Sequence, residues 1–234
     1  MDKYVIIVAG GKGLRMGADL PKQFIPVAGK PLLMHTLEAF YQWDSSAHIV
    51  LVLPEDHQSY WKMLCEEIGC EVPHRIVTGG ATRFNSVKNG LDSILFERNQ
   101  IKGNVPCFVA VHDGVRPFVS SEVIQACFER AVIKGAVIPV IPMIDSLRKK
   151  EENGETHPVD RTLYIAVQTP QVFDLAILAK SYEQSDSSLF TDDASVVESM
   201  GYMVDTVIGD RKNIKITTPF DLLIAEAIFA HDIF

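Results

Sequence analysis

The run Tyr4-Val5-Ile6-Ile7-Val8-Ala9, followed at once by Gly10-Gly11-Lys12-Gly13, decides the fold class of this 234-residue chain. A continuous series of β-branched and apolar side chains, without polar alternation, is typical of a strand buried on both faces of a parallel sheet. The glycines that follow permit a tight loop directly after the strand. The chain therefore opens with a buried strand and a glycine-rich turn.

Segments of the same kind alternate along the rest of the chain. Apolar runs predict further strands at residues 49–53, 74–77, 107–111, 136–141, 164–168, 203–207 and 214–216. Helical spacing of apolar side chains predicts helices at 32–43, 56–68, 82–96 and 121–134, and a last one from Pro219. This alternation predicts an α/β fold with an open, mostly parallel, twisted sheet and helices on both faces, in one domain spanning residues 1–234.

The alternation is interrupted between residues 142 and 163. The charged, turn-forming stretch 151–155 is flanked by 146–150 and 158–162, and this pattern predicts a β-hairpin arm that projects from the domain. An arm with polar faces has little core of its own, so we expect a second copy of the chain to stabilise it in a homodimer. A mobile surface loop is the alternative.

Composition excludes several classes of protein. The net charge of −8 argues against nucleic-acid or membrane-surface binding. No apolar run approaches the roughly 20 residues of a membrane span, and the first is too short for a signal peptide, so we expect a cytoplasmic protein. The four cysteines lack C-x-x-C spacing, which favours free thiols over a zinc site: Cys65, Cys70, Cys107 and Cys127.

The glycine-rich loop at residues 9–16 and the Pro21-Lys22-Gln23 string after it carry the sharpest chemical signal. Glycines bring backbone N–H groups close to a polyphosphate. Arg15 and Lys22 add the cations that phosphoryl chemistry needs. The spacing is that of neither a P-loop nor a dinucleotide fingerprint. A plain glycine turn with two solvated cations is the alternative interpretation.

A second glycine motif, Gly79-Gly80-Ala81-Thr82-Arg83, precedes the helix at 82–96. The glycine pair permits the close approach of a ligand. Ser86, on the first turn of that helix, can bond a base or a phosphate. Thr82 could instead be only an N-cap residue.

The string His112-Asp113-Gly114-Val115-Arg116-Pro117 follows a strongly apolar strand. Ligands of open α/β sheets bind beyond the carboxyl ends of the strands. A carboxylate there is well placed to hold Mg²⁺, so Asp113 is the candidate metal ligand. Alternatively, Asp113 caps a turn and pairs with Arg116, and His112 only packs at the strand end.

Three later strings are weaker. Thr169-Pro170-Gln171 follows a predicted strand, and Thr191-Asp192-Asp193-Ala194-Ser195 has an N-cap residue and first-turn acids, so both could be helix entries. Lys215, flanked by isoleucines in the 213–217 string, suggests a cation carried by a strand into the site. A solvated edge lysine is the alternative.

Together these strings, in this order and over nearly the whole chain, resemble the 2-C-methyl-D-erythritol 4-phosphate cytidylyltransferases of isoprenoid precursor synthesis. The opening loop alone would indicate only the wider group of sugar-nucleotide transferases. The later strings narrow the resemblance, namely those at 79–83, 113–117, 160–161, 169–171, 191–195 and 213–215. The resemblance implies a Rossmann-like nucleotidyltransferase fold whose hairpin arm is exchanged between two subunits.

The resemblance also implies roles for individual residues. CTP would be bound by Ala9, Gly10, Gly11, Gly80, Ser86, Asp113 and Gly114. The catalytic cations around the triphosphate would be Arg15, Lys22 and Lys215, with Mg²⁺ on Asp113. The phosphorylated polyol would meet Arg116, Thr169 and Thr191 together with Lys215, and Ser146 and Arg161 from the partner's arm.

The implied reaction transfers CMP from CTP to 2-C-methyl-D-erythritol 4-phosphate and releases pyrophosphate. The chain departs from the family pattern in having Gly10 where alanine is common, Gly114-Val115 where two alanines are common, and Ser146 where threonine is usual. The two glycine departures are closer to the ribitol-5-phosphate cytidylyltransferases, which make CDP-ribitol. Two more functions fit the strings: a transferase that uses another nucleotide, and a nucleotide-binding regulatory module without activity.

Overall fold

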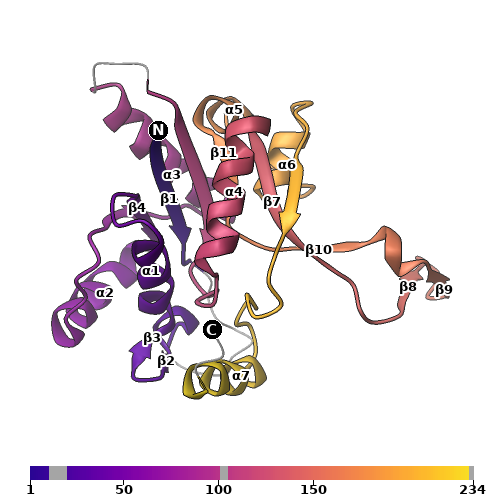
Figure 1. Cartoon of the computed structure of the whole chain (residues 1–234), viewed down its shortest axis with the longest axis horizontal. Coiled ribbons are helices and arrows are strands. Elements are labelled where there is room, and N and C mark those ends of the chain that lie inside the picture. Colours follow the sequence, from indigo (N-terminus) through magenta and orange to yellow (C-terminus); the bar gives the residue numbers. More distant parts are fainter. Residues whose placement is uncertain (11–19, 101–104, 232–234) are drawn as a thin grey trace.

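The computed structural model describes residues 1–10, 20–100 and 105–231, and its centre is one mixed sheet (Figure 1). The strand order is β10-β7-β11-β6-β1-β4-β5, with β12 beside β7. The strands are β1 Asp2–Val8, β4 His48–Leu53, β5 Arg75–Thr78, β6 Cys107–Asp113, β7 Ala136–Pro142, β10 Ile165–Val167, β11 Gln171–Asp174 and β12 Asp205–Ile208. The four strands from β6 to β5 are parallel, as is the β7–β12 pair, so the predicted mostly parallel sheet is confirmed.

Helices cover both faces of this sheet. They are α1 Leu32–Trp43, α2 Glu55–Ile68, α3 Arg83–Arg98, α4 Ser121–Lys134, α5 Leu175–Ser181 and α6 Asp193–Glu198. The last helix, α7 Pro219–Ala230, packs instead on a smaller core beyond the strand ends. Alternate residues of β1 feed two separate cores: Val5 and Ile7 pack with α1, α2 and α4, whereas Tyr4 and Ile6 pack with α3, α5 and α6. Burial on both sides is the physical reason for the uninterrupted apolar run in the sequence.

The loops after the parallel strands are held side by side by backbone hydrogen bonds beyond the strand ends. The Ala9 N–H donates to the Val52 carbonyl at 3.0 Å, and the Gly79 N–H donates to the Leu53 carbonyl at 2.8 Å. The Gly114 N–H donates to the carbonyl of Val8 at 2.9 Å. The three glycine-containing strings therefore meet at one edge of the sheet.

Two strand predictions are corrected. The segment 214–216 is not a strand, although the Ile216 N–H donates to the Val115 carbonyl at 3.0 Å and the Ile216 side chain is fully buried. Conversely, the antiparallel strand β11 was not predicted, because its apolar core is only Val172 and Phe173. Two short elements were also not predicted: the 3₁₀ turn η2 (Lys22–Phe24) and the β2–β3 hairpin (Pro26–Val27 and Lys30–Pro31).

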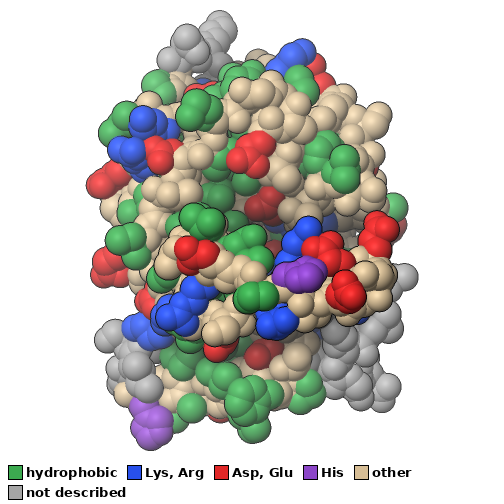
Figure 2. Space-filling view, turned by 90° about the vertical axis from the view of Figure 1, so that its right-hand side faces the viewer, with side chains coloured by type: hydrophobic (Ala, Val, Ile, Leu, Met, Phe, Trp, Pro, Cys, Tyr) green, Lys and Arg blue, Asp and Glu red, His purple; other side chains and the backbone are tan. Residues whose placement is uncertain are grey.

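The predicted arm is present as the antiparallel hairpin of β8 (Leu147–Lys150) and β9 (Thr156–Val159), which projects sideways from the sheet in Figure 1. Among the described residues, these two strands pair only with each other. Charged side chains gather over the arm where it faces the viewer in Figure 2. Two apolar side chains near its base are strongly exposed, Ile144 by 61% and Leu163 by 80%. In the described part of the chain no helix is long and apolar enough to cross a membrane.

An ion pair between a partly exposed arginine and a buried aspartate joins α3 to α6, which lie on the same face of the sheet but far apart in the sequence. Arg83 donates from both terminal nitrogens to the carboxylate of Asp193, at 2.9 and 2.6 Å. The Tyr182 hydroxyl donates to the same carboxylate at 2.6 Å. Asp193 is fully buried, so its charge depends on these donors.

We expect Asp193→Asn to lower the free energy of unfolding by about 2–4 kcal/mol, because it leaves the Arg83 guanidinium without its counter-charge. Tyr182→Phe, which keeps the pair and removes one hydrogen bond, should cost about 1 kcal/mol. Glu183→Gln, which alters only the exposed pair with Lys180, should cost close to nothing. Urea unfolding measures all three, and equal midpoints for Asp193→Asn and Glu183→Gln would contradict the prediction.

Candidate functional site

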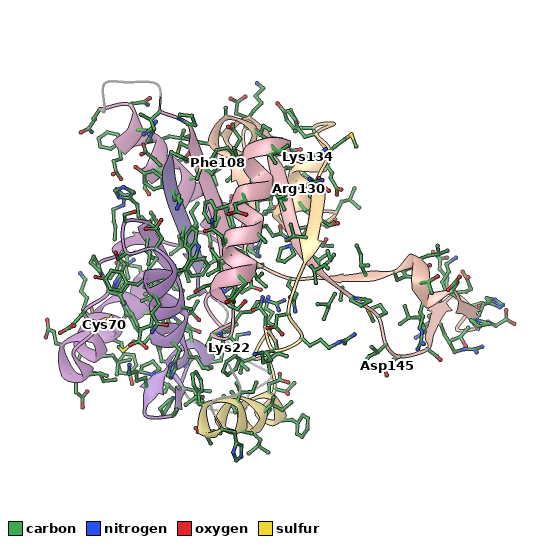
Figure 3. The ribbon with its side chains drawn as sticks, in the orientation of Figure 1. Lys22, Cys70, Phe108, Arg130, Lys134 and Asp145 are labelled. Atoms are coloured by element: carbon green, nitrogen blue, oxygen red, sulfur yellow. The ribbon has the colours of Figure 1, made fainter. Side chains whose placement is uncertain are left out.

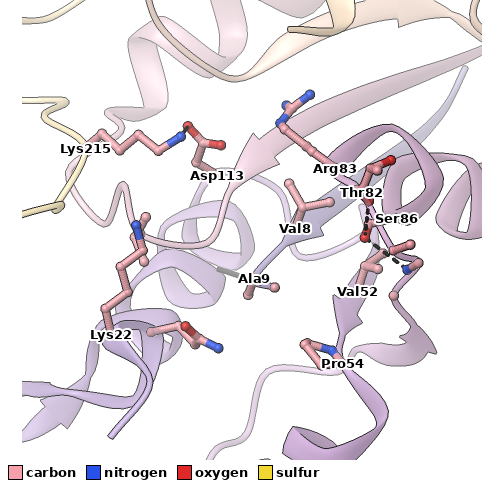
Figure 4. Close-up of a pocket in the computed structure, with 16 residues that line it drawn as sticks. Val8, Ala9, Lys22, Val52, Pro54, Thr82, Arg83, Ser86, Asp113 and Lys215 are labelled. Carbon is pink, nitrogen blue, oxygen red and sulfur yellow. Dashed lines mark hydrogen bonds and ion pairs between the residues drawn. The ribbon is translucent and has the colours of Figure 1, made fainter. Parts of the chain in front are cut away.

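A cavity of about 280 Å³ lies at the edge where the parallel strands end (Figure 4). Its walls come from the ends of β1, β4 and β6, the η2 turn, the start of α3 and the segment before α7. The residues predicted from the sequence that line it are Ala9, Gly10, Lys22, Gly80, Ser86, Asp113 and Lys215. The sheet topology thus brings together loops from the first half of the chain and a lysine close to its end.

The glycine pair forms one wall at very close range. A Cβ on Gly80 would lie 2.4 Å from the Cβ of Asn85 and 2.9 Å from its carbonyl carbon, so only glycine fits there. The Gly80 N–H donates to the Ser86 hydroxyl oxygen at 3.1 Å, and that hydroxyl donates to the Thr82 carbonyl at 2.9 Å. Thr82 is also the N-cap of α3, so the capping interpretation is confirmed alongside the cavity.

The charged centre of the site is Asp113, at the end of β6 and 7% exposed. Its Oδ2 atom lies 3.1 Å from the Nζ of Lys215 and 3.1 Å from the Nε of Arg116. Burial by itself raises the pKa of Asp113, but Lys215, Arg83 and Arg116 outweigh burial and hold the pKa well below its usual range. The carboxylate is therefore ionised. The predicted alternative, that Asp113 pairs with Arg116, is present as a contact.

His112, beside that carboxylate, is fully buried and neutral. Burial lowers the pKa of His112 to about 4. Its Nε2 lies 3.1 Å from the carbonyl of Arg116, which can only accept, so Nε2 carries the proton. Its Nδ1 then accepts from the Thr169 hydroxyl at 2.9 Å, and that hydroxyl oxygen accepts the Asp113 N–H at 3.2 Å. His112 is a packing and hydrogen-bonding residue, as the sequence suggested, and both ring nitrogens are engaged.

A second cavity, also of about 280 Å³, adjoins the first. It is lined by Arg83, Asp113, Arg116, Val167, Gln168, Thr169, Gln171, Thr191, Asp192 and Lys215. The three residues predicted to meet the acceptor, Arg116, Thr169 and Thr191, all lie in this set. Arg83, Asp113 and Lys215 line both cavities, so a ligand in each would meet at these three charges.

Five residues of this set had no role predicted from the sequence, namely Arg83, Val167, Gln168, Gln171 and Asp192, and two of them connect separate parts of the site. Arg83 belongs to the second glycine motif and forms a wall between the cavities. Gln171 ties β11 to the 191–195 string: its side-chain N–H donates to Asp192 at 2.8 Å, and its oxygen accepts the Ala194 N–H at 2.9 Å. Arg83 and Gln171 both lie inside motifs quoted from the sequence, and that position was the signal by which they could have been found. Their hydrogen-bond partners lie more than 20 residues away in the chain, and no sequence pattern links the partners to them.

The remaining predicted residues lie elsewhere. Gly114 lines neither cavity but packs behind Ala9, where an added Cβ would lie 2.8 Å from that residue's own Cβ. Gly11 and Arg15 fall outside the described residues. Ser146 and Arg161 are exposed on the arm segment, and Arg161 donates to the carbonyl of Ile144. Figure 3 shows Asp145, the neighbour of Ser146, well apart from Lys22.

The chain is similar to proteins of known activity over almost its full length. The family model IspD, 2-C-methyl-D-erythritol 4-phosphate cytidylyltransferase, matches residues 3–231. Relatives of that name from Phocaeicola vulgatus and Bacteroides fragilis are 56% and 54% identical, over 97% of this chain and 100% of theirs.

Solved structures agree. The 2-C-methyl-D-erythritol 4-phosphate cytidylyltransferase of Thermus thermophilus is 33% identical, with a TM-score of 0.73 over 97% of this chain and 98% of its own. The 4-diphosphocytidyl-2C-methyl-D-erythritol synthase of Anaerococcus prevotii is 29% identical, with a TM-score of 0.80 over 98% and 96%. The resemblance inferred from the sequence is confirmed, and the chain belongs to the family of 2-C-methyl-D-erythritol 4-phosphate cytidylyltransferases.

Proposed function

We propose that this protein transfers CMP from CTP to 2-C-methyl-D-erythritol 4-phosphate, giving 4-diphosphocytidyl-2-C-methyl-D-erythritol and pyrophosphate. The observation that carries the proposal is the shared wall of the two cavities. Joining two phosphates requires that two anions be brought together. Lys215, Arg83 and Arg116 supply positive charge where the cavities adjoin. The names of the relatives supply the nucleotide and the acceptor.

In the reaction, a phosphate oxygen of the acceptor attacks the α-phosphorus of CTP. The bond from the α-phosphorus to the bridging oxygen breaks, and pyrophosphate leaves in line. A phosphate monoester is largely ionised near neutral pH, so no strong general base is required. His112 is neutral and hydrogen-bonded through both ring nitrogens, and it does not act as a general base in this scheme. Catalysis then rests on positioning and on stabilising the developing charge.

Each residue of the site has a role in this scheme. Gly80 and Ser86 approach the base and ribose of CTP from the α3 side. Lys22, on the η2 turn, neutralises charge that develops at the α-phosphate and the leaving group, together with Arg15. Arg116, Thr169 and Thr191 bind the acceptor, and Lys215 bridges acceptor and nucleotide. The Thr169 hydroxyl is held in place for the acceptor by the Asp113 N–H and by His112 Nδ1.

Magnesium fits this donor set as part of a substrate complex. Among the described residues no group of three or more histidine, cysteine or carboxylate side chains could hold a metal ion. Mg²⁺, however, is commonly held by one or two carboxylates together with substrate phosphates. Asp113, ionised and at the junction of the cavities, is the residue that would hold it. The ion would screen the repulsion between the two anionic substrates.

The arm supports a homodimer. Ser146 and Arg161 lie outside both cavities of their own chain, and in the part of the chain that the structure describes no other strand pairs with the arm's hairpin. A second chain placed against the arm would receive these side chains at its acceptor cavity. The cytoplasmic location expected from the sequence stays a prediction.

Pyrophosphate release by the purified protein with CTP and Mg²⁺ tests the function. We expect rapid release with 2-C-methyl-D-erythritol 4-phosphate and much slower release with ribitol 5-phosphate, and a preference for CTP over UTP, GTP and ATP. Faster turnover of ribitol 5-phosphate would overturn the acceptor assignment and make the departures at Gly10 and Gly114 the better guide. Nucleotide binding without release would identify a regulatory module.

We expect Lys22→Ala to lower kcat by about 100-fold or more, because a cation that stabilises charge in the transition state is removed. Lys62→Ala, a matched change at an exposed position of α2, should leave kcat unchanged. The urea midpoint of both variants should match that of the wild type. Near-normal turnover by Lys22→Ala would remove Lys22 from the mechanism.

Mixing two inactive variants tests the exchanged arm. Lys22→Ala and Arg161→Ala should each be nearly inactive alone. In a mixed dimer, one site combines the intact Lys22 of one chain with the intact Arg161 of the other. Random re-association should therefore restore about a quarter of wild-type activity, since half of the dimers are mixed and one site in each is complete. No recovery, with mixed dimers present by native mass spectrometry, would mean that Arg161 acts in its own chain, and full activity of Arg161→Ala alone would mean that Arg161 has no role.

A further inference from the structure

Two cysteines are brought together at the carboxyl end of α2. The helix ends at Ile68, and Gly69 adopts the left-handed conformation with φ of 77°. The N–H groups of Gly69 and Cys70 both donate to the Cys65 carbonyl, at 3.0 and 2.9 Å. This closing turn folds the chain back on the helix. It places Cys70, the sixth residue of the turn, beside Cys65, the first.

The closing turn brings the two thiols next to each other, and both side chains pack at the edge of the core that contains Trp61. Interaction with Cys65 is the main cause that lowers the pKa of Cys70 to about 7, against the opposing effect of burial. The same interaction, with burial, raises the pKa of Cys65. Cys70 is therefore the cysteine that forms a thiolate more readily.

The other cysteines of the chain are in a different setting. Cys107 and Cys127 are 6% and 0% exposed, and burial raises the pKa of their thiols to about 11 and about 12. Cys65 and Cys70 are only partly buried. Figure 3 shows Cys70 on the side of the molecule opposite the arm.

We propose that Cys65 and Cys70 form a site of reversible oxidation, which reacts with hydrogen peroxide to give an intramolecular disulfide. The Cys70 thiolate attacks one peroxide oxygen, the O–O bond breaks, and the departing hydroxide takes up a proton to leave as water. The Cys65 sulfur then attacks the resulting sulfenic acid, the S–O bond breaks, and the Cys65 proton leaves with the hydroxide as a second water. Two thiols and one peroxide give one disulfide and two waters, and a dithiol reductant reverses the change.

The site is independent of the proposed transferase chemistry. Pro54, which lines the nucleotide cavity, directly precedes α2, whereas the two cysteines are at the other end of this 14-residue helix. The disulfide would fix the turn that the Cys65 carbonyl already closes. The proposal can therefore fail while the transferase assignment stands, and the reverse also holds.

Peptide mass spectrometry of the full-length protein provides the test. The reduced protein is treated with hydrogen peroxide, denatured in iodoacetamide and digested with trypsin. Both cysteines fall in one peptide, Met63–Arg75, because trypsin cleaves after Lys62 and Arg75. We expect that peptide to lose two hydrogens and to escape alkylation, and to regain both thiols after dithiothreitol. Peptides with Cys107 and Cys127 should be alkylated at the same peroxide dose.

Single variants separate the two roles. In Cys65→Ser, Cys70 should accumulate as a sulfenic acid that dimedone traps. In Cys70→Ser, oxidation of Cys65 should be slower by about tenfold or more than that of Cys70 in Cys65→Ser. The alanine variants at both positions repeat the test if a serine variant fails to fold. Equal rates for the two cysteines, or oxidation of Cys107 or Cys127 before this pair in the wild type, would overturn the proposal.

Discussion

The buried carboxylate of Asp113 is the constraint on which the rest of the site depends. It stands at the end of β6, every residue of which is buried, and an ionised group there is costly unless cations lie against it. Arg116, three residues on, and Lys215, about a hundred residues on, supply that charge. The same cations hold the segment before α7 against the strand ends, because Arg116 also donates to the Asn213 carbonyl at 2.8 Å. The charge of Asp113 thus holds together the side chains and the chain segment that line the two cavities.

Much of the fold could be predicted because local signals and tertiary packing agree. The helices at 32–43 and 121–134 have the predicted bounds, since an apolar stripe and a clear stop signal coincide in each. The secondary-structure predictions that failed concern segments whose conformation depends on tertiary contacts. Ile214 and Ile216 are apolar because they fill a small core under α7 and not because they pair in the sheet. The strand β11 forms because it pairs with β6 and β7, and no local sequence pattern predicts that pairing.

The site was predictable for a different reason: its residues sit in short strings after buried strands, and parallel strands end at one edge. The sequence could not show how those strings pair. The contact of Arg83 with Asp193 spans 110 residues, and the hydrogen bond between the Thr169 hydroxyl and His112 spans 57. The roles of Arg15 and Gly11, outside the described residues, and those of Ser146 and Arg161, on the arm, remain predictions that rest on resemblance.

The edge strand β10 affects the solubility of the newly made protein. Ile165 and Val167 in it are half exposed, and Leu163 before it is almost fully so. An uncovered strand with apolar side chains is a template on which other chains can add strands, and a newly made chain carries that hazard until something covers the edge. Whatever packs there also guards against aggregation, so high-level expression without it should fill inclusion bodies rather than the soluble fraction.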